Sequence, residues 1–132
     1  MRILIVEDQR DVLECLRGYF RERGHEVMTA CTEREALEWL SGSQPQLAFI
    51  DLMLPRGHGR AVIQEIARND GEKVTPTRMV VITACDDLQL RKEMLALGVT
   101  DYLFKPLTLR DLDALLETVP APAPIPQPEN KP

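Results

Sequence analysis

The stretch FIDLMLPRGHG, residues 49–59, places an aspartate at the end of an apolar run, just before a proline and two glycines. An unbroken apolar run of this kind is typical of a strand buried on both faces of a parallel sheet. Ligands bind such sheets at the edge where the carboxyl ends of the strands meet. Asp51, the last residue of the run, is therefore the first candidate functional residue.

Five short runs of this kind recur along the chain, and helix-spaced apolar residues fill the segments between them. Parallel pairing is the arrangement open to strands that alternate with helices of ten or more residues. The sequence therefore predicts an α/β fold, a (βα)5 doubly wound, five-stranded parallel sheet with helices on both faces. The predicted strands cover residues 2–6, 26–30, 47–51, 79–83 and 101–104.

Turn and cap residues agree with this division. Gly24 and Gly98 follow predicted helices, where a left-handed residue commonly ends the helix. Thr32 and Glu35 have the spacing of a capping box at the start of another helix. From Pro120 onward the chain reads PAPAPIPQPENKP, which cannot continue a helix. We expect one domain over residues 1–119 and a Pro-rich tail or linker over 120–132.

Composition narrows the class of function. The 132 residues include 21 acidic and 16 basic side chains, a net charge of -5, so direct binding to nucleic acid or to a membrane surface is not expected. The first apolar stretch is only four residues long, too short for a signal peptide, which predicts a cytoplasmic protein. Cys15, Cys31 and Cys85 lack metal-site spacing, and we expect reduced, mostly packed thiols.

Ionisable and hydroxyl side chains gather at the predicted strand ends. Glu7 and Asp8 follow the first strand, Thr83 ends the fourth, and Lys105 follows the fifth. The second strand offers no such group, which suits a strand order of 2-1-3-4-5 with the second strand at the edge. In that order the first and third strands are neighbours, so Glu7, Asp8 and Asp51 come together.

Three carboxylates facing one lysine leave roughly -2 of unbalanced charge, which calls for a cation. Mg²⁺ prefers carboxylate and carbonyl oxygens and works with phosphate groups. An aspartate can itself accept a phosphoryl group as an acyl phosphate. The strand ends therefore predict a Mg²⁺-dependent site for phosphoryl transfer.

Four motifs carry a family resemblance: VED at 6–8, FIDLMLP with its following glycines at 49–59, VITA at 81–84 and DYLFKP at 101–106. Together they resemble the receiver domain of bacterial two-component response regulators, of the chemotaxis type, over residues 1 to about 119. The resemblance implies a flavodoxin-like fold. It also implies that Asp51 is phosphorylated by a phosphohistidine of a sensor histidine kinase or a histidine phosphotransfer protein.

The same resemblance gives the acidic residues their roles. It implies that the side chains of Glu7, Asp8 and Asp51 and the backbone carbonyl of Met53 surround Mg²⁺. Such a domain is a phospho-acceptor switch that catalyses only its own phosphorylation and dephosphorylation, and is not an enzyme in the usual sense.

The resemblance also implies a switch. Thr83 and Lys105 would contact the phosphoryl oxygens, and the peptide bond before Pro106 would be cis. Tyr102 would change rotamer with the state of the site. The face formed by the fourth helix, fifth strand and fifth helix would then bind a downstream protein or a second copy in a homodimer.

Other interpretations of single residues stay open. Asp51 could be a helix N-cap, and Glu7 with Asp8 could be a solvated first turn of a helix. Thr83 could simply finish a strand, and Tyr102 could be core packing. We expect His58 to lie in an exposed loop.

Three other functions also compete with the phosphorylated receiver. A haloacid dehalogenase-type phosphatase would need D-x-D-x-T after the first strand, where this chain has VEDQRD. A pseudo-receiver would bind partners without phosphate, although such modules usually lack one of the site residues present here. The chain could also be the receiver of a longer regulator whose output domain follows residue 132.

Overall fold

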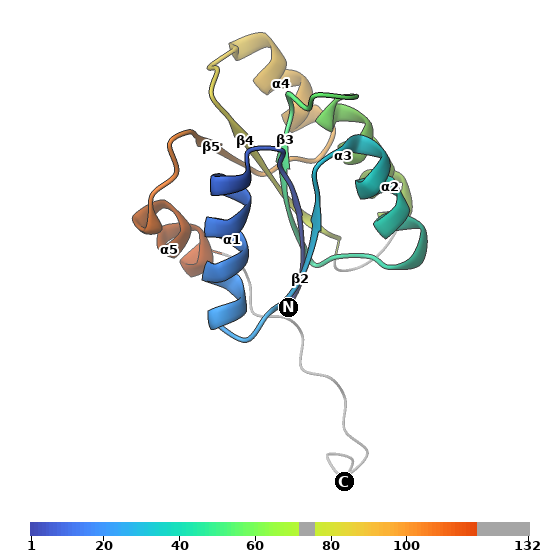
Figure 1. Ribbon diagram of the computed structural model, residues 1–132. Coiled ribbons are helices and arrows are strands. Elements are labelled where there is room, and N and C mark those ends of the chain that lie inside the picture. Colours follow the sequence, from blue (N-terminus) through green and yellow to red (C-terminus); the bar gives the residue numbers. More distant parts are fainter. Residues whose placement is uncertain (72–75, 119–132) are drawn as a thin grey trace, which may run out of the picture.

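Five strands and five helices alternate along the chain in the computed structural model, which describes residues 1–71 and 76–118 (Figure 1). The strands are β1 (Arg2–Val6), β2 (Glu26–Ala30), β3 (Leu47–Asp51), β4 (Arg78–Thr83) and β5 (Asp101–Phe104). The helices are α1 (Arg10–Glu22), α2 (Glu33–Gly42), α3 (Gly59–Asp70), α4 (Leu88–Ala96) and α5 (Leu109–Thr118). The predicted strands are confirmed, except that β4 begins one residue earlier than expected.

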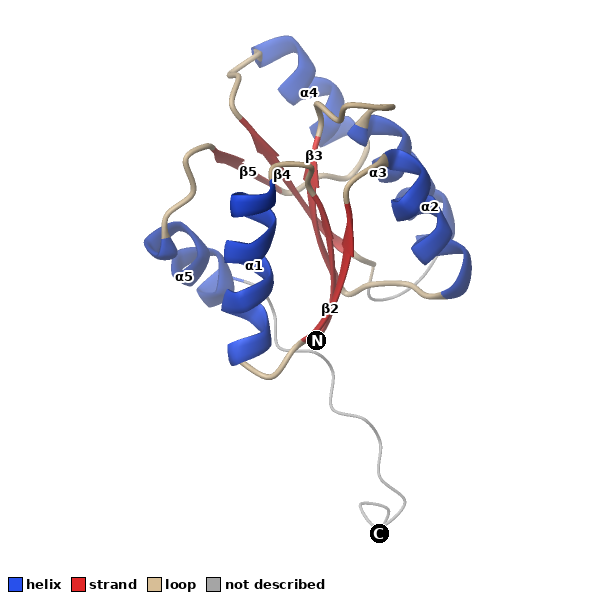
Figure 2. Ribbon diagram, viewed as in Figure 1, coloured by secondary structure: helices blue, strands red, loops and turns tan. Residues whose placement is uncertain are grey.

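All strand pairs are parallel, in the order β2-β1-β3-β4-β5, which confirms the predicted doubly wound sheet. Figure 2 shows the strands as one central layer between helices. Every residue of β3 is buried, as its apolar sequence predicts. Val6 at the end of β1 pairs with Ile50 near the end of β3, so the residues that follow them meet at the same edge.

Successive residues of the central strands face opposite sides of the sheet and join two separate cores. Phe49 packs on one side against Phe20 of α1, with ring centroids 5.2 Å apart, in a core that α5 also lines. Ile50 packs on the other side with Val62 and Ile66 of α3, in a core shared with α2 and α4. Helices thus cover both faces (Figure 1), and the strand ends are held rigidly between the two layers.

The predicted roles of Gly24 and Gly98 at helix ends and of Thr32 as a helix cap are confirmed. Gly24 and Gly98 have φ values of 84° and 107°, the left-handed conformation that glycine adopts without strain. The Thr32 hydroxyl accepts a hydrogen bond from the Glu35 amide at 3.1 Å and caps α2. The packed-thiol expectation is wrong for two of the three cysteines: Cys15 and Cys85 are free and exposed, because each falls on a solvent-facing position.

The predicted domain boundary at residue 119 and the predicted Pro-rich tail over 120–132 lie outside the described residues. Among the helices within the described ranges, none is long and apolar enough to cross a membrane.

Candidate functional site

Asp51 lies at the carboxyl end of β3 and is only 4% exposed. Its Oδ1 accepts a hydrogen bond from the backbone amide of Met53 at 3.0 Å, which holds the carboxyl group at the mouth of the β3–α3 loop. The N-cap of α3 is His58, whose Nδ1 accepts from the Arg60 amide at 2.9 Å. The helix-cap interpretation of Asp51 is therefore wrong. His58 lies in the loop before α3, as expected, but it is half-buried, so the expectation that it is exposed is wrong.

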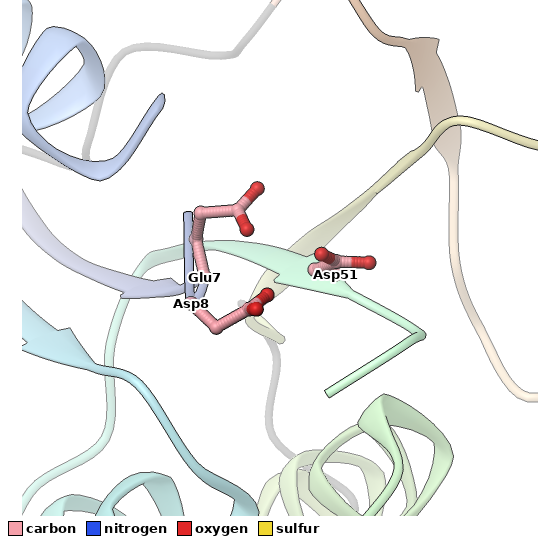
Figure 3. A group of neighbouring side chains, drawn as sticks. All are labelled: Glu7, Asp8 and Asp51. Carbon is pink, nitrogen blue, oxygen red and sulfur yellow. The ribbon is translucent and has the colours of Figure 1, made fainter. Parts of the chain in front are cut away.

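Glu7 and Asp8 bring two more carboxyl groups to the same edge. Glu7 is fully buried, and its Oε2 accepts a hydrogen bond from the Gln9 amide at 3.0 Å, whereas Asp8 is exposed. Each of Glu7, Asp8 and Asp51 offers a carboxylate oxygen, and these oxygens all lie within 4.8 Å of one another. Figure 3 shows the three carboxyl groups gathered at the ends of β1 and β3.

The ammonium group of Lys105 faces this cluster from the loop that follows β5. Its Nζ lies 2.7 Å from Glu7 Oε1 and 3.0 Å from Asp51 Oδ2, and the side chain is only 12% exposed. A third oxygen, Oε1 of Gln9, lies 2.7 Å from the same Nζ. The Lys105–Pro106 peptide bond is cis, as the resemblance implied.

Burial and neighbouring charge act differently on the two partners of this ion pair. Burial raises the pKa of Glu7 to about 7, because desolvation and repulsion from Asp51 outweigh the hydrogen bonds from Lys105 and from the Gln9 amide. Burial lowers the pKa of Lys105, but its contacts with Glu7 and Asp51 outweigh that effect and leave the pKa above its ordinary value. The lysine therefore stays charged, while Glu7 titrates near neutral pH.

The donor set fits Mg²⁺. The candidate ligands in the cluster are oxygens, the type that Mg²⁺ prefers. One ammonium group among three carboxyl groups leaves net negative charge when all are ionised, and a divalent cation would balance it. The exposed carboxylate of Asp8 leaves one side open to water, and Mg²⁺ usually retains several water ligands.

Thr83 lies at the end of β4, and Tyr102 lies in the neighbouring strand β5. Thr83 is buried at the end of β4, and its hydroxyl is engaged with the backbone of Cys85: it accepts from the amide at 3.1 Å and lies 3.3 Å from the carbonyl oxygen. Tyr102 of β5 packs against the core that includes α4, and burial raises its pKa. Its hydroxyl is buried and has no hydrogen-bond partner among the described residues. Among the described residues, no hydrogen bond joins either side chain to Asp51.

The loop that carries Met53 is fastened at three points. Met53 and His58 form an isolated antiparallel bridge. The His58 amide donates to Glu33 Oε1 of α2 at 2.9 Å. Gly59 approaches the Asp51 backbone so closely that a Cβ there would lie 2.4 Å from the Asp51 carbonyl oxygen. These contacts set the path of the chain from the end of β3 into α3.

Sequence reasoning missed three residues of this surrounding shell: Gln9, Glu33 and Gly59. The contact between Gln9 and Lys105 spans 96 positions and becomes visible only in the folded chain. In the sequence, the glycines of residues 49–59 stand out only as part of a motif. Gly59 permits a close approach, and a glycine opening a helix just after the candidate residue was the available signal.

Comparisons with known proteins agree with this geometry. Residues 3–117 match the family model described as the response regulator receiver domain. The response regulator MprA of Mycolicibacterium vanbaalenii is 34% identical over 90% of this chain and 50% of its own length. A probable transcriptional regulator, ycf27, of Cyanidium caldarium is 31% identical over 89% of this chain and 45% of its own. The crystal structure of a two-component response regulator from Clostridium difficile superimposes with a TM-score of 0.79 at 29% identity, covering 90% of this chain and 94% of that one.

A doubly wound parallel sheet with an acidic cluster at the ends of β1 and β3 defines a phospho-acceptor class of signalling domain. The chain belongs to the response regulator receiver domain family, and with it to two-component signalling. Its cluster of Glu7, Asp8 and Asp51 is typical of the Mg²⁺ site of that family. Receiver domains are switches that interact with histidine kinases. The chain spans about half the length of the curated relatives named here.

Proposed function

We propose that Asp51 accepts a phosphoryl group from a phosphohistidine, supplied by a sensor histidine kinase or a histidine phosphotransfer protein, in a Mg²⁺-dependent reaction. The observation that carries this proposal is the convergence of three carboxyl groups with Lys105, whose Nζ lies 3.0 Å from Asp51 Oδ2. An isolated acidic residue would not need a buried lysine and two further acids around it.

In the proposed reaction an Asp51 carboxylate oxygen attacks the phosphorus, the bond from phosphorus to the histidine nitrogen breaks, and the imidazole leaves. Asp51 suits the nucleophile because its other contacts, with Met53 and Lys105, fix the orientation of the carboxyl group. Lys105 neutralises charge that develops on the phosphoryl oxygens. The metal, held by Glu7, Asp8, Asp51 and the backbone carbonyl of Met53, would supply further charge neutralisation and orientation.

The proposed switch begins at Thr83. Within residues 1–71 and 76–118 its hydroxyl hydrogen-bonds only to the backbone of Cys85, so a phosphoryl group on Asp51 could draw it away at the cost of local contacts. We infer that this movement opens space toward Tyr102, whose buried hydroxyl has no partner among the described residues. Arg91 of α4 lies 5.3 Å from the centre of the Tyr102 ring, which couples the tyrosine to α4.

The surface that would respond lies on α4, β5 and α5. It exposes large apolar side chains, which mark interaction surfaces when they lie close together. Either a downstream protein or a second copy of the chain in a homodimer could bind it. The exposed residues are Leu88, Leu95, Phe104 and Leu109.

We further propose residues 1–119 as the receiver domain and 120–132 as a Pro-rich tail or linker. The family match over residues 3–117 supports this division. The curated relatives are about twice as long, and one is described as a probable transcriptional regulator. Two candidates could therefore bind the switched surface: an output domain attached to the same chain, or a separate protein.

Intact-mass spectrometry after incubation with acetyl phosphate tests the proposal. We expect one phosphoryl adduct in the presence of Mg²⁺, and none after chelation of Mg²⁺ or in Asp51→Asn. A protein that binds Mg²⁺ yet gains no adduct from acetyl phosphate or from a phosphorylated histidine kinase would contradict it and favour a pseudo-receiver.

A further inference from the structure

Gln9 makes an unusual contact for a residue at its position. It is the N-cap of α1, yet its side chain makes no capping hydrogen bond. The exposed side chain instead reaches toward the strand ends, where its Oε1 accepts from Lys105 Nζ at 2.7 Å. The contact is as short as the one between Lys105 and Glu7.

This contact completes the surroundings of the lysine. An ammonium group has three N–H donors. Nζ donates hydrogen bonds to Gln9 Oε1 at 2.7 Å and to Asp51 Oδ2 at 3.0 Å, whereas Glu7 Oε1, 2.7 Å away, is an ion-pair contact outside hydrogen-bonding geometry. An oxygen of a phosphoryl group on Asp51 that approaches Lys105 therefore competes with Gln9 Oε1 for a hydrogen bond from Nζ.

The three oxygens differ in how firmly they are held. Glu7 and Asp51 are acidic, buried and fixed by backbone amides. Gln9 is neutral and exposed, so it lacks the Coulombic attraction of a carboxylate for the ammonium group, and water can take its place. The carboxamide of Gln9 is thus the group that leaves at the smallest cost in free energy.

We propose that Gln9 is a positioning residue that occupies, in the unphosphorylated state, the donor of Lys105 that the phosphoryl group later takes. The proposal rests on the proposed phosphorylation of Asp51. No covalent bond to Gln9 forms or breaks; one hydrogen bond of Lys105 is exchanged for another. Gln9 acts through Lys105 and restrains phosphorylation by holding that lysine in place.

Substitutions at this position isolate the carboxamide. The contact from residue 9 to Glu7 Oε2 is made by the backbone amide, which every variant except proline retains. Gln9→Met has nearly the same length and no comparable acceptor, whereas Gln9→Glu offers a charged acceptor that holds Lys105 more firmly. Gln64→Met, at an exposed position on α3, is the matched control.

The measurement is the rate of phosphorylation by acetyl phosphate at saturating Mg²⁺, followed by intact mass. From the worth of one hydrogen bond we expect Gln9→Met to react about three- to tenfold faster than the wild type, and Gln9→Glu to react more slowly. The Mg²⁺ dissociation constant of Gln9→Met and the rate of Gln64→Met should stay unchanged. A rate for Gln9→Met that equals or falls below the wild-type rate would overturn the proposal.

A double-mutant cycle shows whether Gln9 acts through Lys105. In a Lys105→Met background, Gln9→Met should no longer change the phosphorylation rate. An equal acceleration with and without the lysine would overturn the assigned role. If the wild type is phosphorylated on Asp51 but Gln9→Met has no effect, only this inference fails; if the wild type takes no phosphoryl group, the proposed function fails with it.

Discussion

The ammonium group of Lys105 lies 3.0 Å from Asp51 Oδ2, although the two residues are 54 positions apart and β4 separates their strands in the sheet. The contact depends on the loop after β5, which carries the lysine back over the end of β4. The contact links the candidate phospho-acceptor Asp51 to the end of β5, next to the exposed apolar side chains of α4 and α5. A change in charge at Asp51 therefore changes its interaction with Lys105 at the end of β5.

Removal of this lysine should separate metal binding from phosphorylation. We expect Lys105→Met to slow phosphorylation by acetyl phosphate about 100-fold, as the loss of a preorganised donor to developing charge does in other sites. Mg²⁺ should bind at least as tightly as in the wild type, because a positive charge has left the cluster. Calorimetry measures the Mg²⁺ affinity, and intact mass measures the phosphorylation rate. Lys105→Arg keeps the charge, so its phosphorylation rate should lie between those of the wild type and Lys105→Met. Equal losses of Mg²⁺ affinity and of phosphorylation rate in Lys105→Met would contradict the proposed role of Lys105.

Mg²⁺ affinity should depend on pH through Glu7. Because burial raises its pKa to about 7, the carboxyl group is mostly protonated at pH 6 and mostly ionised at pH 8. The cation favours the ionised form, so affinity should rise with pH, by about tenfold between pH 6 and 8 for a single competing proton. Calorimetric titrations across this range test it. Glu7→Gln should bind more weakly and show a flatter profile, whereas an equally steep profile would place the titration elsewhere.

Gly59 should tolerate no side chain. A Cβ at this position would lie 2.4 Å from the Asp51 carbonyl oxygen and 2.9 Å from Leu52 Cα, both backbone atoms. We expect Gly59→Ala to lower the free energy of unfolding by about 1–3 kcal/mol, the usual cost of overpacking. Gly18→Ala is the control, because a Cβ on α1 there meets nothing within 4 Å and should stabilise the helix by about 0.5–1 kcal/mol. Urea unfolding measures the free energy of unfolding of both variants. Equal changes in Gly59→Ala and Gly18→Ala would show that the close approach at Gly59 does not restrict its side chain.

Glu33 should stabilise the β3–α3 loop. Its Oε1 accepts the only hydrogen bond recorded from the His58 amide within the described residues, so Glu33→Ala should cost about 1–2 kcal/mol of unfolding free energy. Glu33→Gln keeps an acceptor oxygen and should recover part of that loss. Glu38→Ala on the same helix removes an exposed ion pair with Arg34 and should change stability by less than about 0.5 kcal/mol. Similar losses for Glu33→Ala and Glu38→Ala in urea unfolding would contradict the loop contact.

The fold and the acidic cluster could both be predicted from sequence because they depend on repeated local patterns. The apolar run that ends at Asp51 predicts β3, and the acids after β1 become its neighbours once the strand order is known. The burial of Glu7 could not be predicted in the same way. Nothing in the sequence separates it from the exposed Asp8 beside it, and only the backbone path after β1 turns one carboxyl group inward.

The surrounding contacts depend on tertiary structure and were missed for that reason. His58 was expected to be exposed in its loop, yet it is half-buried: its Nδ1 caps α3, and its amide donates a hydrogen bond to Glu33 of α2. Gln9 gave no signal, because a glutamine near a helix start is ordinary. Its role depends on the position of Lys105, which only the folded sheet determines.

The most direct test of the central claim locates the phosphoryl group. Protein treated with acetyl phosphate and Mg²⁺ is reduced with borohydride, which converts an aspartyl phosphate into homoserine, and is then digested and sequenced by tandem mass spectrometry. We predict homoserine at position 51 alone, and none when Mg²⁺ is chelated. Modification at another carboxyl group with residue 51 unchanged would contradict the account.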